Sequence, residues 1–472
     1  MSMTLFHRVL EANAVYKRFN ERWVADPGFR EALSRDPEGT LERHGIACRP
    51  EDVRAPSEGG YSAATRAMWQ IVQTKSRWVK AFYRGEGAPV DPRIRAFRER
   101  QIARQWLDLG PFHTRSNIHA SLSIELTKGC SVGCWFCALS PGRLSAVFRH
   151  DDRNQALFRG VLCALQDSLG PAAKTGFLYW ATDPLDNPDY ERFCLDFHET
   201  IGVFPPTTTA LPLRDPARTR ALLVMSEARG CWLNRFSILS IKQLDAVHAE
   251  FTAEELSRVE CLPLNRDSAF AFSNAGRFRD RVKKDPGLLD KQRKTLRWAP
   301  WYTGDPSYAG VDAYPLASIG CVTGFLLNMC DRSVQLISPC TADERRPLGY
   351  IVHDEATFED ETTLAAELCR MIDEAMSPVV RPDDRPRFHD WLHYEELPDG
   401  FRLVGRFKGH ATFEGEGRSS AWRALGDLVR GAGKTAAEIT HLVAGIDGVG
   451  PDAAQEMLDD LLRAGVLDEV DG

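Results

Sequence analysis

Three cysteines, Cys130, Cys134 and Cys137, constrain the fold of this chain most, because they lie in one short segment with the spacing C-x3-C-x2-C. Thiolates this close together in a loop can bind one iron–sulfur cluster. No fourth cysteine lies nearby in the sequence, so a 4Fe-4S cluster would keep one iron open to a small molecule. The flanking residues favour a loop, since residues 124–127 read as the end of a strand and residues 128–129 as a turn.

Two simpler interpretations of these cysteines stand beside the cluster. They could be buried apolar residues, because free cysteine often packs in protein cores, or they could bind zinc together with a distant histidine. The three-cysteine spacing is more specific than a lone C-x-x-C, and it favours the cluster over both alternatives.

Length and composition predict a soluble protein of two or three domains. The chain has 472 residues, of which 43% are hydrophobic and 26% are charged. No apolar run approaches the roughly 20 residues of a membrane span, and the first residues lack the apolar core of a signal peptide. We therefore expect a cytoplasmic protein without a membrane partner, whose twelve cysteines are thiols or cluster ligands rather than disulfides. The net charge of −7 argues against nucleic acid as a partner.

The first part of the chain, residues 1–115, is predicted to be a helical region. Asp26 and Asp36 each precede a proline, which places an N-cap residue before a proline at the first helical position. Gly45 is expected to end the second of these helices. This pattern makes residues 10–48 resemble the leader segments of nitrile-hydratase-like precursor peptides.

Two further helices, rich in basic residues, are expected over 63–83 and 92–107. Their positive charge is typical of a solvated helix surface. The alternative is a surface that binds an acidic peptide.

The central region, residues 116–355, alternates strand-like apolar runs with longer helical stretches, which predicts a parallel sheet with crossover helices. The candidate strands are 122–126, 176–180, 207–211, 235–240 and 259–264. A hairpin is expected after them, with strands over 321–328 and 332–337.

The end of the chain is predicted to be a connecting helical segment over 356–400 and a small module over 401–472. The module would contain a β-meander over 403–413, followed by three short helices. It resembles the winged-helix-like precursor-recognition module of peptide-modifying enzymes. A nucleic-acid-binding winged helix has the same outline, but the acidic surplus of this segment argues against it.

Several segments together resemble the radical S-adenosylmethionine (radical SAM) superfamily, and within it the peptide epimerases of proteusin biosynthesis. In chain order they are C-S-V-G-C-W-F-C, Y-W-A-T-D-P-L-D-N-P-D-Y, T-T-T-A, N-R-F-S-I-L-S and G-F-L-L-N-M. The resemblance covers roughly residues 10 to 355. It implies an α/β fold, a partial (β/α)6 radical SAM barrel, with the N-terminal helical region before it and the C-terminal module after it. Pro205-Pro206 departs from the polar residue expected there in relatives.

The resemblance also implies cofactors and an activity. Cys130, Cys134 and Cys137 would bind a 4Fe-4S cluster, and S-adenosyl-L-methionine would occupy its open iron. A 5′-deoxyadenosyl radical would remove the Cα hydrogen of a residue in a ribosomally made precursor peptide. A cysteine thiol would return a hydrogen atom on the opposite face, which converts an L-residue to a D-residue.

Polar residues at the expected strand ends are candidates for binding SAM. Thr182 and Asp183 stand where superfamily members usually have a glycine-rich turn, and a carboxylate there suits the SAM ammonium. A simple Asx-type turn is the alternative. The remaining candidates, at the third and fourth strands, are Thr208, Arg235, Ser237 and Ser240.

The hydrogen donor must be a cysteine that stays a protonated thiol, and apolar burial preserves that form. Cys340 is the first choice, because it follows a predicted strand through Ser338-Pro339 and is expected at a loop mouth facing the barrel. Cys321, which opens the hairpin, is the second choice. A turn residue and a strand core residue are the respective alternatives.

Three functional hypotheses follow, with their partners. The first is an epimerase that binds a leader-bearing precursor peptide and takes electrons from an external donor of flavodoxin or ferredoxin type. The second is another radical SAM peptide maturase, which would form thioether or carbon–carbon cross-links. The third is a non-catalytic, zinc-holding scaffold that binds peptides.

Overall fold

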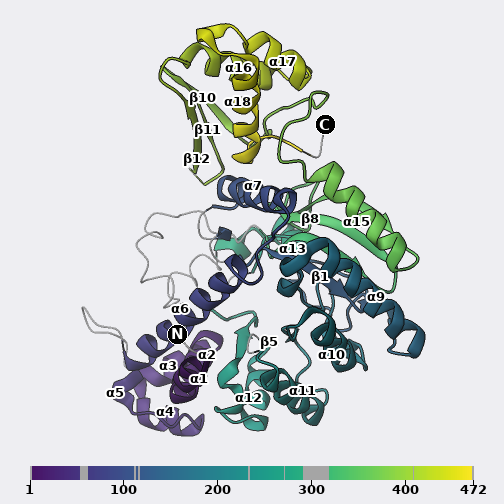
Figure 1. The fold of residues 1–472 in the computed structure, drawn as a ribbon. Coiled ribbons are helices and arrows are strands. Elements are labelled where there is room, and N and C mark those ends of the chain that lie inside the picture. The colour runs from purple at the N-terminus through teal and green to yellow at the C-terminus, as the bar shows by residue number, and fades with distance from the viewer. Residues whose placement is uncertain are drawn as a thin grey trace.

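A computed structural model of the chain describes residues 3–53, 62–110, 113–114, 117–231, 234–269, 272–290, 318–407 and 409–469. Figure 1 shows a group of short helices near the N-terminus, a central region of strands and helices, and a C-terminal module at the opposite end of the molecule. Within the described ranges, no helix is both long enough and apolar enough to cross a lipid bilayer.

The N-terminal helices begin at the predicted capping residues. Asp26 accepts hydrogen bonds from the first backbone N–H groups of α3, and Asp36 does the same for α4. Gly45, with φ of +61°, follows α4. These helices are α1 (Met3–Ala12), α2 (Ala14–Ala25), α3 (Pro27–Arg35), α4 (Pro37–Arg43) and α5 (Pro50–Val53).

Two long helices follow, α6 (Ala63–Arg84) and α7 (Pro92–Asp108), and both confirm the predicted basic helices. α6 packs against α2, so it belongs to the N-terminal group at its first end. Its last turns reach the central region, where the Tyr83 hydroxyl donates to the carbonyl of Thr175. α7 lies between the central region and the C-terminal module (Figure 1).

The first central sheet has the strand order β1-β7-β8-β9. Its strands are β1 (Ala120–Glu125), β7 (Val322–Asn328), β8 (Ser333–Pro339) and β9 (Tyr350–Thr357). β1 and β7 are parallel, whereas β7, β8 and β9 are antiparallel, which confirms the predicted hairpin. On β1, Leu122 and Ile124 face the main hydrophobic core, and Ser123 and Glu125 lie on the opposite face.

Three helices, α9 (Asp152–Leu169), α10 (Tyr190–Ile201) and α15 (Glu361–Ala375), pack together and contribute to that core. Fully buried phenylalanines such as Phe158, Phe193 and Phe325 fill it. Helices therefore cover this apolar face of the sheet.

The second central sheet is parallel, with the order β4-β5-β6. Its strands are β4 (Thr208–Thr209), β5 (Asn234–Ile238) and β6 (Val259–Pro263), and α11 (Pro216–Ala228) and α12 (Ile241–Glu250) connect them. On β5, Phe236 and Ile238 pack against α12, while Arg235 and Ser237 alternate to the other face. Ala25 of α2 belongs to the same apolar cluster, so the leader-like segment is packed onto this sheet.

The strand predicted over 176–180 forms only a single parallel bridge, between Phe177 and Ser123. Side-chain bonds replace the expected ladder there: the Thr175 hydroxyl accepts from the N–H of Ser121, and the Ser123 hydroxyl donates to the carbonyl of Tyr179. The two central sheets are therefore separate, and among the described residues neither is closed. The partial barrel stays a prediction.

The C-terminal module contains a three-stranded antiparallel sheet and three helices. They are β10 (His393–Leu397), β11 (Gly400–Val404), β12 (His410–Glu414), α16 (Ser419–Gly431), α17 (Ala436–Val443) and α18 (Pro451–Arg463). The three predicted helices are confirmed, including the Thr435 capping box of α17. The sheet begins earlier than expected, inside the predicted connecting segment. β10 was not predicted because it carries mostly polar side chains and lacks an apolar strand pattern.

The module packs tightly on α7. Gly405 lies so close to this helix that an added Cβ would stand 2.2 Å from the carbonyl oxygen of Leu107. Gly465 is equally close, with 2.4 Å to the carbonyl oxygen of Arg100. Asp108 accepts from Arg406 of the module and from the N–H of Thr341 after β8, so one carboxylate joins the module, α7 and the first central sheet.

Candidate active site

The cysteine loop follows β1, where the short strand β2 (Thr127–Lys128) pairs with β3 (Ala146–Val147). Gly129 makes the turn before the first cysteine, with φ of +82°, and an added Cβ would stand 2.2 Å from the carbonyl oxygen of Arg143. The N–H of Cys130 then donates to the carbonyl of Gly142 at 3.1 Å. The two ends of the loop are therefore held together at its base, where the backbone segments approach so closely that only glycine fits at position 129.

The three cysteines offer only sulfur donors, and each is half-buried. The pKa of Cys134 is raised to about 12, first by burial and then by Cys137 and Cys130, whose thiolates would repel its own. In the part of the chain that the structure describes, no group of three or more His, Cys, Asp or Glu side chains stands ready to hold a metal ion. By donor type the loop still fits an iron–sulfur cluster, since three thiols and no carboxylate or imidazole come from one short segment.

Asp186 anchors the outer part of the loop. It is buried at the end of η2 (Pro184–Asp186), and it accepts from the Ser131 N–H at 2.8 Å and from the Ser131 hydroxyl at 2.5 Å. Arg214 binds both residues, at 2.9 Å from Asp186 and 2.8 Å from Ser131. Sequence reasoning did not assign this role, although the D-P-L-D-N-P segment that contains Asp186 was singled out.

The other side of the loop is held by α13 (Gly276–Lys284). The backbone N–H of Arg277 donates to the carbonyl of Cys137 at 3.0 Å, and its side chain contacts the carbonyl of Cys134 at 3.4 Å. Trp135 packs edge-on against Phe272 with ring centroids 5.2 Å apart. Aromatic rings and bound carbonyls therefore shield the segment between the second and third cysteines.

Asp183, a predicted SAM contact, joins the ends of two strands. One carboxylate oxygen accepts from the Thr209 hydroxyl at 2.7 Å and from the Leu185 N–H at 3.0 Å, and the other accepts from the Ala210 N–H at 2.7 Å. Burial raises the pKa of Asp183 to about 6, although these hydrogen bonds oppose the shift. The bond to Leu185 is the Asx-type turn considered above, and Thr182 lies half-buried beside it.

Polar side chains from both central sheets face one another, and we call this region the interior. It is formed by Ser123, Glu125, Tyr179, Thr208, Arg235, Ser237 and Asn328. The Thr208 hydroxyl bonds to the Tyr179 hydroxyl at 2.8 Å, which links β4 to the segment beside β1. Thr208, Arg235 and Ser237 are thus brought together as predicted residues, whereas Ser240 lies outside as the exposed N-cap of α12.

Arg235 does not stand free in the interior, because it is paired with Glu260 of β6 at 2.9 Å. The same carboxylate binds Lys75 of α6 at 2.7 Å. Burial would raise the pKa of Glu260, but the two cations outweigh it and hold the pKa far below its usual value. The pattern of the sequence gave no sign of Lys75 or Glu260, since their contact joins residues far apart in the chain.

The two predicted donor thiols take different positions. Cys321 immediately precedes β7, so it lies at the end of the interior where β1 and β7 begin. Its electrostatic neighbours there are Tyr83, Tyr179 and Arg235. Burial raises the pKa of its thiol to about 11, against a smaller lowering by Arg235. The cysteine loop follows the opposite end of β1, about 20 Å away at 3.3 Å per strand residue.

Cys340 follows β8 and is buried under the end of α7, where its electrostatic neighbours are Asp108, Arg104 and Arg346. Burial raises the pKa of this thiol to about 12. These three neighbours come from the end of α7 and from the segment after β8, and the expected position of Cys340 at a loop mouth facing the barrel stays a prediction. β8 runs antiparallel to β7, so it carries the chain back to the end of the sheet remote from the cysteine loop, which is the end where Cys321 also lies.

Glu125 is a site residue that the sequence reasoning missed. It ends β1 five residues before the first cysteine, and its carboxylate accepts from the Ala181 N–H at 2.7 Å and from Asn328 at 3.0 Å. Burial raises its pKa to about 7, although both hydrogen bonds oppose the shift. The sequence feature that could have indicated Glu125 is an acidic residue within an apolar run that predicts a strand.

A protein of Sinorhizobium fredii, described as uncharacterized protein y4wI, is 33% identical to this chain over 471 residues, covering 96% of the chain and 86% of the relative. The chain belongs to the y4wI family. No family model and no solved structure matches it. The residues of this chain outside the alignment are fewer than the residues of its N-terminal, central or C-terminal part. The relative therefore aligns with at least most of each part.

Proposed function

We propose that this member of the y4wI family is a radical SAM peptide epimerase, which converts L-residues to D-residues in a ribosomally made precursor peptide. The observation that carries the proposal is an interior with the three-cysteine loop at one end and the Cys321 thiol at the other. A peptide held between these two ends would have the cofactors on one side of its Cα and a thiol on the other, as two hydrogen transfers on opposite faces need. The strands of a partial (β/α)6 barrel would be β1, the Phe177 segment, β4, β5, β6 and β7.

Cys130, Cys134 and Cys137 would hold the cluster, and the polar strand ends beside them, with Thr182, Asp183 and Ser237, would bind SAM. When bound, this pair of cofactors supplies a 5′-deoxyadenosyl radical that removes a Cα hydrogen. Asp183 holds the ends of two strands together through three hydrogen bonds, and this fixes the position of the turn at Thr182. Its carboxylate would accept a charge-assisted hydrogen bond from the SAM ammonium.

Cys321 is our choice of hydrogen donor, in place of Cys340. Its raised pKa keeps the S–H bond intact at neutral pH, and it lies on the interior side of the sheet. The thiol gives a hydrogen atom to the Cα radical, so an S–H bond breaks and a Cα–H bond forms. One electron from an external donor and one proton from water then restore the thiol.

The C-terminal module is our candidate for binding the leader of the precursor. In the order β10-β11-β12, the outer strands β10 and β12 each have a strand on one side only among the residues that the structure describes. An extended leader would add a strand to one of these edges, with backbone hydrogen bonds for affinity and side-chain contacts for specificity.

The test is a reconstitution under anaerobic conditions. The chain is loaded with iron and sulfide and mixed with SAM, a reductant and a synthetic peptide that carries a nitrile-hydratase-like leader, in deuterated water. Deoxyadenosine together with a gain of one mass unit per modified residue is the expected result. A loss of two mass units would indicate cross-linking instead, and a chain that binds zinc but no iron would refute the proposal.

A further inference from the structure

A buried acceptor and a buried donor lie next to each other at the interior, and the chain leaves part of each unused. Glu125 is 8% exposed, and its carboxylate accepts from the Ala181 N–H and from Asn328. Among the described residues it has no ion pair. Trp180 immediately precedes Ala181 and is also 8% exposed, and its indole N–H has no hydrogen-bond partner in the part of the chain that the structure describes.

Both groups raise the free energy of the folded chain while they stay unpaired. A buried carboxylate without a cation and a buried N–H without an acceptor each lose interactions that water supplies to the unfolded chain. A carboxylate has about four lone-pair sites, and Glu125 uses two of them within the chain. An acceptor site on Glu125 and the N–H of Trp180 are therefore left for a ligand.

Packing holds the Trp180 indole on the interior side of the first central sheet. Its ring meets that of Tyr350 on β9 edge-on, with ring centroids 6.0 Å apart. Leu326 of β7 and Ile337 of β8 belong to the same apolar cluster, which is separate from the main core on the other face. Leu139, two residues after the last cysteine of the loop, packs against this cluster, so the unused donor lies beside the cysteine loop.

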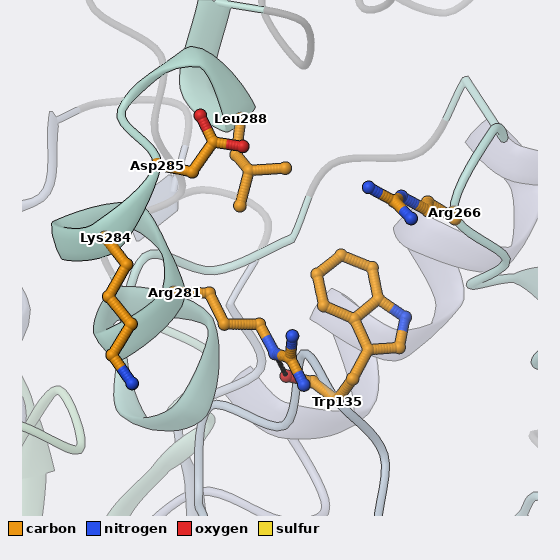
Figure 2. A pocket seen from close by; sticks show the side chains of 6 residues that line it. All are labelled: Trp135, Arg266, Arg281, Lys284, Asp285 and Leu288. Atoms are coloured by element: carbon orange, nitrogen blue, oxygen red, sulfur yellow. Dashed lines mark hydrogen bonds between the residues drawn. The ribbon is translucent and has the colours of Figure 1, made fainter.

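A second tryptophan near the loop, Trp135, faces a different space. It lines a pocket of about 350 Å³, and Figure 2 shows its indole between the helix that carries Arg281 and the segment that carries Arg266. The other lining residues are Lys284, Asp285 and Leu288. None of the residues that define the interior lines this pocket, so the two tryptophans serve separate surfaces.

We propose that Glu125 and Trp180 bind the backbone of the precursor peptide at the residue that is modified. The Glu125 carboxylate accepts a hydrogen bond from a peptide N–H, and the Trp180 indole N–H donates to a peptide carbonyl. The inference rests on the proposed function, and it adds which part of the substrate the interior recognises. Both groups bind and orient the peptide, and neither exchanges an atom with it.

The chemistry of the two groups fits a peptide better than other ligands. One acceptor and one donor match a peptide backbone, in which each residue offers one N–H and one C=O. A purely cationic ligand would leave the indole N–H unpaired, and an anionic ligand would be repelled by Glu125. Apolar walls strengthen both hydrogen bonds. Because backbone groups are the same in every residue, this contact positions a Cα whatever its side chain.

The test measures peptide binding to the chain without its cofactors, so that it does not depend on catalysis. The probe is a fluorescein-labelled peptide with a nitrile-hydratase-like leader and a core of alternating alanine and valine residues, followed by fluorescence anisotropy. Trp180→Phe keeps a ring but removes the N–H, and Glu125→Gln keeps the shape but removes the charge. Each should weaken binding about tenfold, as expected for one hydrogen bond. Trp23→Phe, in the N-terminal helices, is the matched control and should bind like the unaltered chain.

An ester scan of the peptide separates direct contact from a structural effect of the variants. In each probe of the scan, one core amide is replaced by an ester, which removes a single N–H. With the unaltered chain, one position should lose about tenfold in affinity. With Glu125→Gln, the same position should lose no more than its neighbours.

The inference would be overturned by equal ester losses in the two chains at every position, by unchanged binding of both variants, or by a lack of binding to the unaltered chain. These outcomes are separate from those of the proposed function. If the reconstituted chain forms no D-residue but the scan shows a position that depends on Glu125, the proposed function fails and the backbone contact stands. If D-residues form and the scan shows no such position, the contact fails and the function stands. When both hold, deuterium should enter at or next to the ester-sensitive residue, and entry elsewhere would overturn the inference.

Discussion

Replacing Asp186 by alanine should release the cysteine loop without unfolding the protein. The Asp186 side chain is fully buried and accepts two hydrogen bonds from Ser131 and one from Arg214. Each bond to a buried carboxylate contributes about 1.5–3 kcal/mol. Arg214 is 46% exposed and Ser131 can bind water after the change, so we discount the sum to about 3 kcal/mol. At 1.4 kcal/mol per tenfold, the loop should open about a hundredfold more often.

Hydrogen–deuterium exchange of the peptide that contains Ser131 measures this opening directly. In Asp186→Ala its amide exchange should accelerate by roughly that factor, while exchange in the strands of the main core stays unchanged. Asp189→Ala is the matched control, because Asp189 lies in the same segment but binds Arg149 and the N–H of His150. Unchanged exchange at Ser131, or an equal acceleration in the control, would refute the anchoring role of Asp186.

Three other predictions concern the interior. Cys321→Ser should still form deoxyadenosine but lose the D-residue product in the deuterium assay, and Cys340→Ser should keep both; the opposite pattern would restore Cys340 as the donor. Glu125 has a folded pKa of about 7 against a usual 4.5, so its ionisation costs stability as pH rises through this window. The melting temperature of the unaltered chain should therefore fall relative to that of Glu125→Gln between these pH values, by the equivalent of about 3 kcal/mol, and parallel curves would contradict this. Glu260→Gln leaves both Lys75 and Arg235 without their carboxylate and should lower the free energy of unfolding by about 2 kcal/mol, a loss that replacing Lys75 by methionine should recover in part in urea unfolding.

Local features of this fold could be predicted from the sequence because the residues that determine them are neighbours in the chain. Asp26, Asp36 and Thr435 cap helices by bonding to N–H groups two or three residues away, so their patterns are visible in the sequence. The hairpin of β7 and β8 follows from two apolar runs around one turn.

Features that depend on contacts between distant segments could not be predicted in this way. The parallel pairing of β1 with β7 joins residues about 200 positions apart, and the ion pair of Lys75 with Glu260 joins two parts of the molecule. Cys340 shows the consequence for the candidate site. Its position after a strand was read correctly, but the direction of that strand within the sheet decides which end of the sheet the thiol occupies.

Two glycines bring the C-terminal module into close backbone contact with α7, since a methyl group at Gly405 or Gly465 would collide with backbone atoms of the helix. Asp108 of α7 joins the module in turn to the first central sheet. If the leader binds to the sheet edge of the module, the distance from that edge to the interior sets the number of residues between the leader and the modified position. Lengthening the precursor by two or three residues after the leader should move the D-residue by the same number along the peptide.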